Sequence, residues 1–181
     1  MPRYAAFLRG VNLGSTRKVS GADLCSLFED LGFEDVASFR NSGNVALSGE
    51  RAPAAALAAR IEEGVAATLG FESAVLVRSA PQMRELSARR PFTPARVERS
   101  HGKLQVMLLA GKPRAAVKRE ALALAGDDDA LAFGACELFW LPRGGMRDSK
   151  LDVRRLEGLL APTTMRTMGT IQQMTAKFFA D

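Results

Sequence analysis

The sequence predicts an α+β protein built from two tandem split βαβ units, each with the order βαββαβ, followed by one further helix. Short apolar runs of strand length alternate with longer segments that have helical spacing. Capping residues and glycines bound those segments. The same order of elements occurs twice along the 181 residues, a length that can bury a core as one domain or as two small halves.

The first half opens with a strand and a helix that are joined by a glycine-rich loop. A Ser-x-x-Asp box starts the helix at Ser20, and Gly32 ends it. The cluster at 41–44 is typical of a hairpin turn, and Gly70 ends an alanine-rich helix. The elements expected here are strand 4–8, helix 20–31, strands 36–39 and 45–47, helix 53–69 and strand 74–77.

The second half repeats this order without detectable sequence identity to the first. A Ser-x-x-Gln box at Ser79 starts a connecting helix, and 91–102 is the expected linker. The predicted domains are therefore 1–90, the linker 91–102, and 103–181. Later elements expected are strand 104–109, helix 113–125, a turn at 127–129, strands 130–133 and 137–141, a helix from Ser149 to Leu160, an extended piece at 164–166, and a helix opened by a box at Thr170.

Composition sets only broad limits on function. The net charge of +5 comes from 25 basic and 20 acidic residues, a mild excess that suits an anionic partner without identifying nucleic acid. No apolar run approaches the roughly 18 residues that span a bilayer, and the N-terminus shows no apolar signal core. Cys25 and Cys136 form no CxxC pair and are expected as reduced, buried thiols. We therefore expect a cytoplasmic protein without a membrane partner; the oligomeric state is left open.

A series of short motifs carries a family resemblance. Residues 4–14 read YAAFLRGVNLG, followed by LGF at 31–33 and SGNV at 42–45; later pieces are RPF at 90–92, SKL at 149–151 and TT at 163–164. Together they resemble, over nearly the whole chain, the uncharacterised family called domain of unknown function 1697. The resemblance implies an α+β fold with two ferredoxin-like halves and implies no activity.

The chain departs from that family at three places. Ser15 stands where a second glycine usually follows Gly14, and Gly21 replaces a methionine at the start of a helix. The family tends to read Arg-Asn-Trp-Asn-Thr where this chain has RTMGT at 166–170. A ligand-binding role carried by that element would be changed or lost here.

Several kinds of chemistry are disfavoured. The single histidine, His101, is expected in a surface loop, which leaves no basis for a histidine triad or a two-histidine metal site. Cys25 falls on the apolar stripe of its helix, and the acidic run at 127–129 is expected to be a solvated turn. Ser149 is expected to cap a helix rather than act as a nucleophile. We assign no catalytic residue, no metal and no cofactor.

The loop between the first strand and helix is the strongest candidate site. Its spacing matches neither a P-loop nor a dinucleotide fingerprint. It does place two cations just before a helix N-terminus, an arrangement that favours phosphate or carboxylate. The glycine-rich loop 142–147 leads to the Ser149 helix in a similar way. The candidate ligand-binding residues, with Asn12 and Asn44 as hydrogen-bonding specifiers, are Arg9, Asn12, Gly14, Arg17, Lys18, Ser42, Asn44, Arg147, Lys150 and Arg166.

Three function classes stay open. The first is a module that binds an anionic, phosphate-containing ligand through its glycine-rich basic loops. The second is an enzyme that acts on a phosphorylated or carboxylated small molecule through positioning and Arg/Lys electrostatics. The third is a nucleic-acid-binding or oligomerising module. RNA-binding sheets usually present exposed aromatic residues on their strands, and the few aromatic residues here are expected mainly in the core, which weakens the nucleic-acid alternative.

Overall fold

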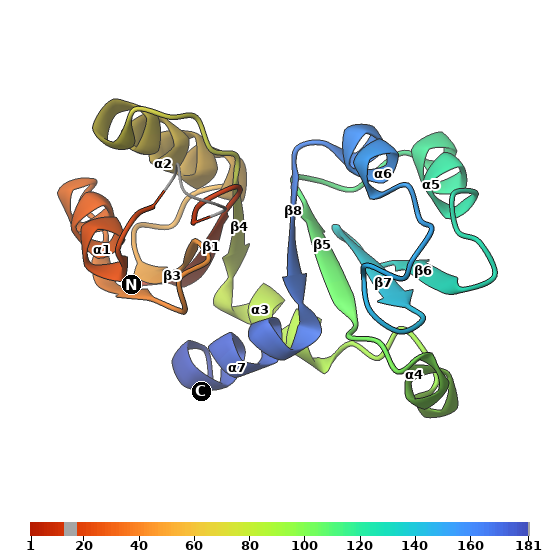
Figure 1. Cartoon of the computed structure of the whole chain (residues 1–181). Coiled ribbons are helices and arrows are strands. Elements are labelled where there is room, and N and C mark those ends of the chain that lie inside the picture. The colour runs from red at the N-terminus through yellow and green to blue at the C-terminus, as the bar shows by residue number, and fades with distance from the viewer. Residues whose placement is uncertain (13–17, 181) are drawn as a thin grey trace. The chain divides into compact units, whose positions relative to one another are not determined.

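The computed structural model describes residues 1–12 and 18–180 (Figure 1). It has two four-stranded antiparallel sheets with helices, as expected for an α+β protein. The chain forms two compact units. The first unit comprises Met1–Leu86 together with Met174–Asp181, and the second comprises Ser87–Gln173.

The first unit has the predicted order βαββαβ. Its sheet has the strand order β2-β3-β1-β4, and all of its neighbouring strands are antiparallel. Leucines 24 and 27 on the first helix and Ile61 on the second are buried in one core with residues of the strands. The elements are β1 (Arg3–Leu8), α1 (Gly21–Asp30), β2 (Glu34–Ser38), β3 (Asn44–Ser48), α2 (Ala54–Leu69) and β4 (Val75–Ser79).

The second unit repeats this plan. Its strand order is β6-β7-β5-β8, again with antiparallel neighbours, and Trp140 and Leu156 lie in its core. Helix α3 leads into the unit and α7 leads out of it. Most of α3 and the end of α7 belong to the first unit. The remaining elements of the chain are α3 (Ala80–Ala88), α4 (Pro94–Ser100), β5 (Gln105–Leu109), α5 (Ala115–Leu122), β6 (Asp129–Phe133), β7 (Glu137–Pro142), α6 (Val153–Leu160), β8 (Thr163–Thr167) and α7 (Met168–Phe178).

Three helix starts differ from the prediction. The stretch 91–102, expected as a linker, contains α4, whose cap is Thr93 with proline at the first helical turn. Helix α6 is capped by Asp152 rather than by Ser149, because the Ser149 hydroxyl is bound to another carboxylate. Helix α7 begins at Met168, directly after β8 ends at Thr167. The Thr167 hydroxyl accepts from the Thr170 N–H, so Thr170 lies inside the helix and does not precede it.

The end of α7 belongs to the first unit, whereas the sequence places the whole terminal helix with the second half. The Thr175 hydroxyl donates to the Met83 carbonyl at 3.3 Å, and Arg84 donates to the Phe179 carbonyl at 3.0 Å. The Phe178 ring packs edge-on against Phe39. Helical periodicity shows which face of a helix is apolar but not which core that face joins.

The two halves share a short signature that sequence comparison does not reveal. Arg78 in β4 and Arg166 in β8 are each the fourth residue of the last, edge strand of their sheet. Each Nη1 donates to the carbonyl of the preceding residue, at 3.0 Å and 2.8 Å. The next residues, Ser79 and Thr167, provide the side-chain oxygens that accept at the starts of α3 and α7. The repeat therefore includes an Arg-Ser/Thr step from strand to helix.

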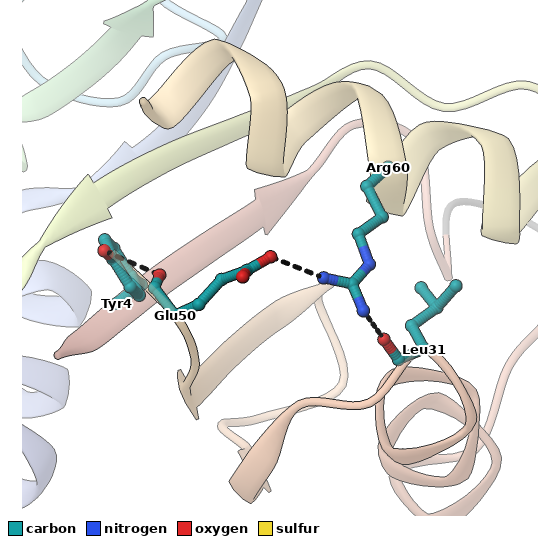
Figure 2. A network of polar contacts seen from close by, with 4 residues as sticks. All are labelled: Tyr4, Leu31, Glu50 and Arg60. Carbon is teal, nitrogen blue, oxygen red and sulfur yellow. Dashed lines mark hydrogen bonds and ion pairs between the residues drawn. The ribbon is translucent and has the colours of Figure 1, made fainter. Parts of the chain in front are cut away.

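Arg60 of α2 holds the end of α1 in place (Figure 2). Its Nη2 donates to the Leu31 carbonyl at the C-cap of α1, and its guanidinium lies over the Phe33 ring, 4.8 Å from the centroid. Its Nη1 is 3.5 Å from the Glu50 carboxylate, and the Tyr4 hydroxyl donates to the Glu50 carbonyl at 3.3 Å. A cation at a helix C-terminus also opposes the negative end of the helix dipole.

Candidate functional site

The loop after β1 and the β2–β3 turn meet in the first unit. The Leu8 N–H donates to the Gly43 carbonyl at 2.8 Å. Gly43 has a φ of +68°, and a Cβ at this position would lie 3.0 Å from the Leu8 carbonyl oxygen and 3.3 Å from the Val11 Cβ. LRGVN and SGNV, two motifs of the family resemblance, are therefore packed against each other.

Two asparagines hold these segments. The Asn12 Oδ1 accepts from the Val19 N–H at 2.8 Å, and its Nδ2 donates to the Val19 carbonyl at 3.0 Å, so Asn12 closes the loop across 12–19. Asn44 is fully buried, and its Nδ2 donates to the Phe39 carbonyl and the Ser42 hydroxyl, both at 3.0 Å. These amides, expected to specify a ligand, stabilise the loop and the turn in this structure.

A hollow of about 500 Å³ lies where the loop reaches α1; we call it the first-unit hollow. Among the described residues of its lining, the cation is Lys18, which is exposed. Ser20 caps α1 as predicted: its Oγ accepts from the Asp23 N–H at 3.0 Å and donates to the Asp23 carboxylate at 2.7 Å. The described residues that line it include no carboxylate; they are Asn12, Lys18, Val19, Ser20, Gly21 and Asn41.

The other candidates of the first half have different positions. The Arg9 main chain extends the sheet contacts beyond β1: its N–H donates to the Ala74 carbonyl at 2.9 Å, and its carbonyl accepts from the Ser73 hydroxyl at 2.7 Å. Arg9 is half-buried and does not line the first-unit hollow. Gly14 and Arg17 lie outside the described residues.

The remaining candidates belong to the second unit. Arg147 and Lys150 are exposed in the loop after β7. Arg166 lies within β8, where its Nη1 donates to the Thr164 hydroxyl at 2.9 Å and to the Met165 carbonyl at 2.8 Å. Burial lowers the pKa of Arg166 to about 10, so the guanidinium is still charged at neutral pH. The first unit thus holds Lys18, Asn12 and the Ser42–Asn44 turn, whereas the second unit holds Arg147, Lys150 and Arg166.

A further hollow, of about 490 Å³, was not anticipated from the sequence; we call it the second-unit hollow. Asp129, expected in a solvated turn, is only 5% exposed and accepts from Trp140 Nε1 at 2.6 Å and from the Ser149 hydroxyl at 2.8 Å. The sequence held one signal of this burial: Asp129, Leu131 and Phe133 stand at every second position of β6, and residues two apart in a strand share a face.

Other features of the described residues bear on chemistry. His101 is exposed, as expected, and ends α4 with a φ of +52°. Cys25 and Cys136 form no disulfide with each other and are half-buried rather than buried as expected. Across residues 1–12 and 18–180, no three His, Cys, Asp or Glu side chains gather as metal ligands. No helix in the same ranges is long and apolar enough to cross a membrane.

Comparison with known proteins places the chain in a family. A family model described as a protein of unknown function (DUF1697) matches residues 1–139, which confirms the resemblance. The structure of the conserved bacterial protein SP0830 from Streptococcus pneumoniae is similar, with a TM-score of 0.71 and 25% identity over 96% of this chain and 98% of that chain. No curated protein matches. The chain belongs to the DUF1697 family.

Proposed function

We propose that the protein binds a small phosphate-containing anion in the first-unit hollow. The observation that carries this proposal is a hollow beside the N-terminus of α1 whose described lining holds a lysine, amides and a hydroxyl but no carboxylate. A volume of about 500 Å³ lies within the range of small-molecule sites.

The electrostatics of this hollow favour an anion. Helix N-termini carry partial positive charge on their N–H groups, and Lys18 stands two residues before the N-cap Ser20. Asn12 and Asn41 bring amide groups to the same lining. Asp23 reduces the local positive charge, but its carboxylate accepts a hydrogen bond from Ser20. An exposed lysine beside amide and hydroxyl groups suits a phosphate better than a neutral ligand.

We also infer that each half has the ferredoxin-like arrangement. The first strand of each half lies between its third and fourth strands, and all sheet neighbours are antiparallel, which supports this inference. The predicted domain boundaries and the cytoplasmic location stay predictions.

The test is titration calorimetry of the full chain with inorganic phosphate, pyrophosphate and AMP. Lys18→Ala is expected to weaken binding of the best of these anions by about tenfold, the order of one charge-assisted hydrogen bond. Lys103→Ala is the matched control, because Lys103 is also exposed but lies in the second unit. Wild-type protein that binds none of the three anions, or a Lys18→Ala variant that binds them as wild type does, would overturn the proposal.

A further inference from the structure

The second-unit hollow lies among α4, the start of β6 and the end of β7. Its walls are held by close backbone contacts. The Gly144 N–H donates to the Ser100 carbonyl at 2.6 Å, which joins the end of α4 to the segment after β7. A Cβ at Gly102 would lie 2.0 Å from the Pro142 carbonyl oxygen, so only glycine allows this approach. Helix α4 is therefore fixed against β7 and presents its side chains in a set position.

Two of the three aspartates in the hollow are already paired. Asp129 accepts hydrogen bonds from Trp140 and Ser149. Asp128 accepts from Arg143, with Nη1 and Oδ1 2.9 Å apart, and its carbonyl accepts from the Arg143 N–H at 3.0 Å. The ion pair offsets the charges of Arg143 and Asp128, whereas Asp129 keeps its negative charge and has its oxygens occupied by Trp140 and Ser149. These contacts fix that side of the hollow.

The charged groups whose hydrogen-bonding capacity is still available to a ligand come from two segments. Arg96 and Arg99 are exposed and lie three residues apart on α4, so they occupy one helix face. Arg96 lies over the Phe92 ring, 5.8 Å from its centroid, and the guanidinium donors of both arginines make no hydrogen bond within the described structure. Asp127, in the segment before β6, contributes a carboxylate to the same hollow. The hollow thus combines a pair of guanidinium groups with one acceptor.

This combination of groups selects a ligand class. Guanidinium groups bind phosphate oxygens with two or more directed hydrogen bonds, and a carboxylate accepts hydrogen bonds from sugar hydroxyls. A volume of about 490 Å³ accommodates a compound that carries both. We propose that the second-unit hollow is a ligand site for a small phosphorylated sugar, with the phosphate on Arg96 and Arg99 and hydroxyls on Asp127. This site is independent of the proposed function, which concerns the other unit.

The chain has a built-in reporter for this site. Trp140 is the only tryptophan in the sequence, it is fully buried, and its Nε1–H is bound to Asp129, which lines the hollow. A ligand that changes the surroundings of Asp129 will change this hydrogen bond. The indole N–H signal in an NMR spectrum and the tryptophan emission therefore report on the second-unit hollow and not on Lys18.

The experiment titrates ribose 5-phosphate, inorganic phosphate and free ribose into the wild type and into the Lys18→Ala variant, which weakens the first-unit site. In both proteins, ribose 5-phosphate is expected to shift the Trp140 indole signal at lower concentration than phosphate, and ribose alone to give no shift. The double variant R96Q/R99Q is expected to weaken binding of both phosphates by about tenfold or more. D127N is expected to weaken ribose 5-phosphate alone.

The matched control is R51Q/R154Q, which removes two exposed arginines outside the hollow and is expected to bind as wild type does. A Trp140 signal that responds to neither phosphate, or that responds equally in R96Q/R99Q, would overturn the site. A D127N variant that keeps the full preference for ribose 5-phosphate over phosphate would overturn the sugar assignment. Failure of the first-unit proposal would instead leave the Trp140 response intact and abolish only the effect of Lys18→Ala on calorimetric binding.

Discussion

Replacing Gly43 with alanine tests the contact between the hairpin turn and the loop after β1. Two effects oppose alanine there. The left-handed backbone, at a φ of +68°, costs a non-glycine residue about 1–2 kcal/mol. The new methyl would also lie 3.0 Å from the Leu8 carbonyl oxygen and 3.1 Å from the Leu8 Cβ, and crowding in a packed site costs about 1–3 kcal/mol more.

Gly70→Ala separates these two effects. Gly70 has a φ of +72°, and a Cβ there would meet nothing within 4 Å, so it is subject only to the backbone cost. Both glycines lie in the first unit, and urea unfolding followed by circular dichroism gives the free energy of unfolding of each variant. Gly43→Ala is expected to be less stable than Gly70→Ala by about 1–3 kcal/mol. Equal stability of the two variants would refute the close packing of the turn on the loop.

Two other predictions concern arginines. Arg60→Ala is expected to lower the free energy of unfolding by about 1–2 kcal/mol, because the contacts with Leu31 and Phe33 are lost. Glu50→Gln is expected to change it by less than about 0.5 kcal/mol, because the Glu50 side chain is 75% exposed. Thermal unfolding of both variants tests this difference. Burial lowers the pKa of Arg166 from its ordinary value to about 10. Above that pH the unfolded chain holds a proton that the folded chain has lost, so rising pH favours folding. The stability of wild type relative to Arg166→Met is therefore expected to increase above about pH 10 in urea unfolding, and a constant difference would contradict the lowered pKa.

Much of the fold could be predicted because its signals are local. Periodicity located the strands and most helices, and the caps at Ser20 and Ser79 form the expected hydrogen bonds. Gly32 and Gly70 end their helices with positive φ angles of 79° and 72°. Each of these features depends on residues within one turn of one another, which is the range over which a single sequence is informative.

The features that were missed depend on distant partners. Ser149 was expected to cap a helix, but its hydroxyl binds Asp129, 20 residues away in the sequence. The run of three aspartates at 127–129 predicts a solvated turn, but Asp129 is bound to Trp140 of the neighbouring strand. The same holds for the candidate site: Asn44 was expected to bind a ligand, and its amide is bound to the Phe39 carbonyl across the turn. Residue type and spacing do not reveal such competition for hydrogen bonds.

The return of α7 to the first unit constrains the order in which the protein can be completed during synthesis. Leu86 leaves the ribosome before the 87 residues from Ser87 to Gln173, and only afterwards does Met174 appear. Phe179, which is 1% exposed, and Thr175 are therefore supplied to a core whose other members were translated first. The half of the molecule that is made first waits longest to finish folding, and a fragment that stops at Leu86 lacks the Phe178 ring that packs on Phe39.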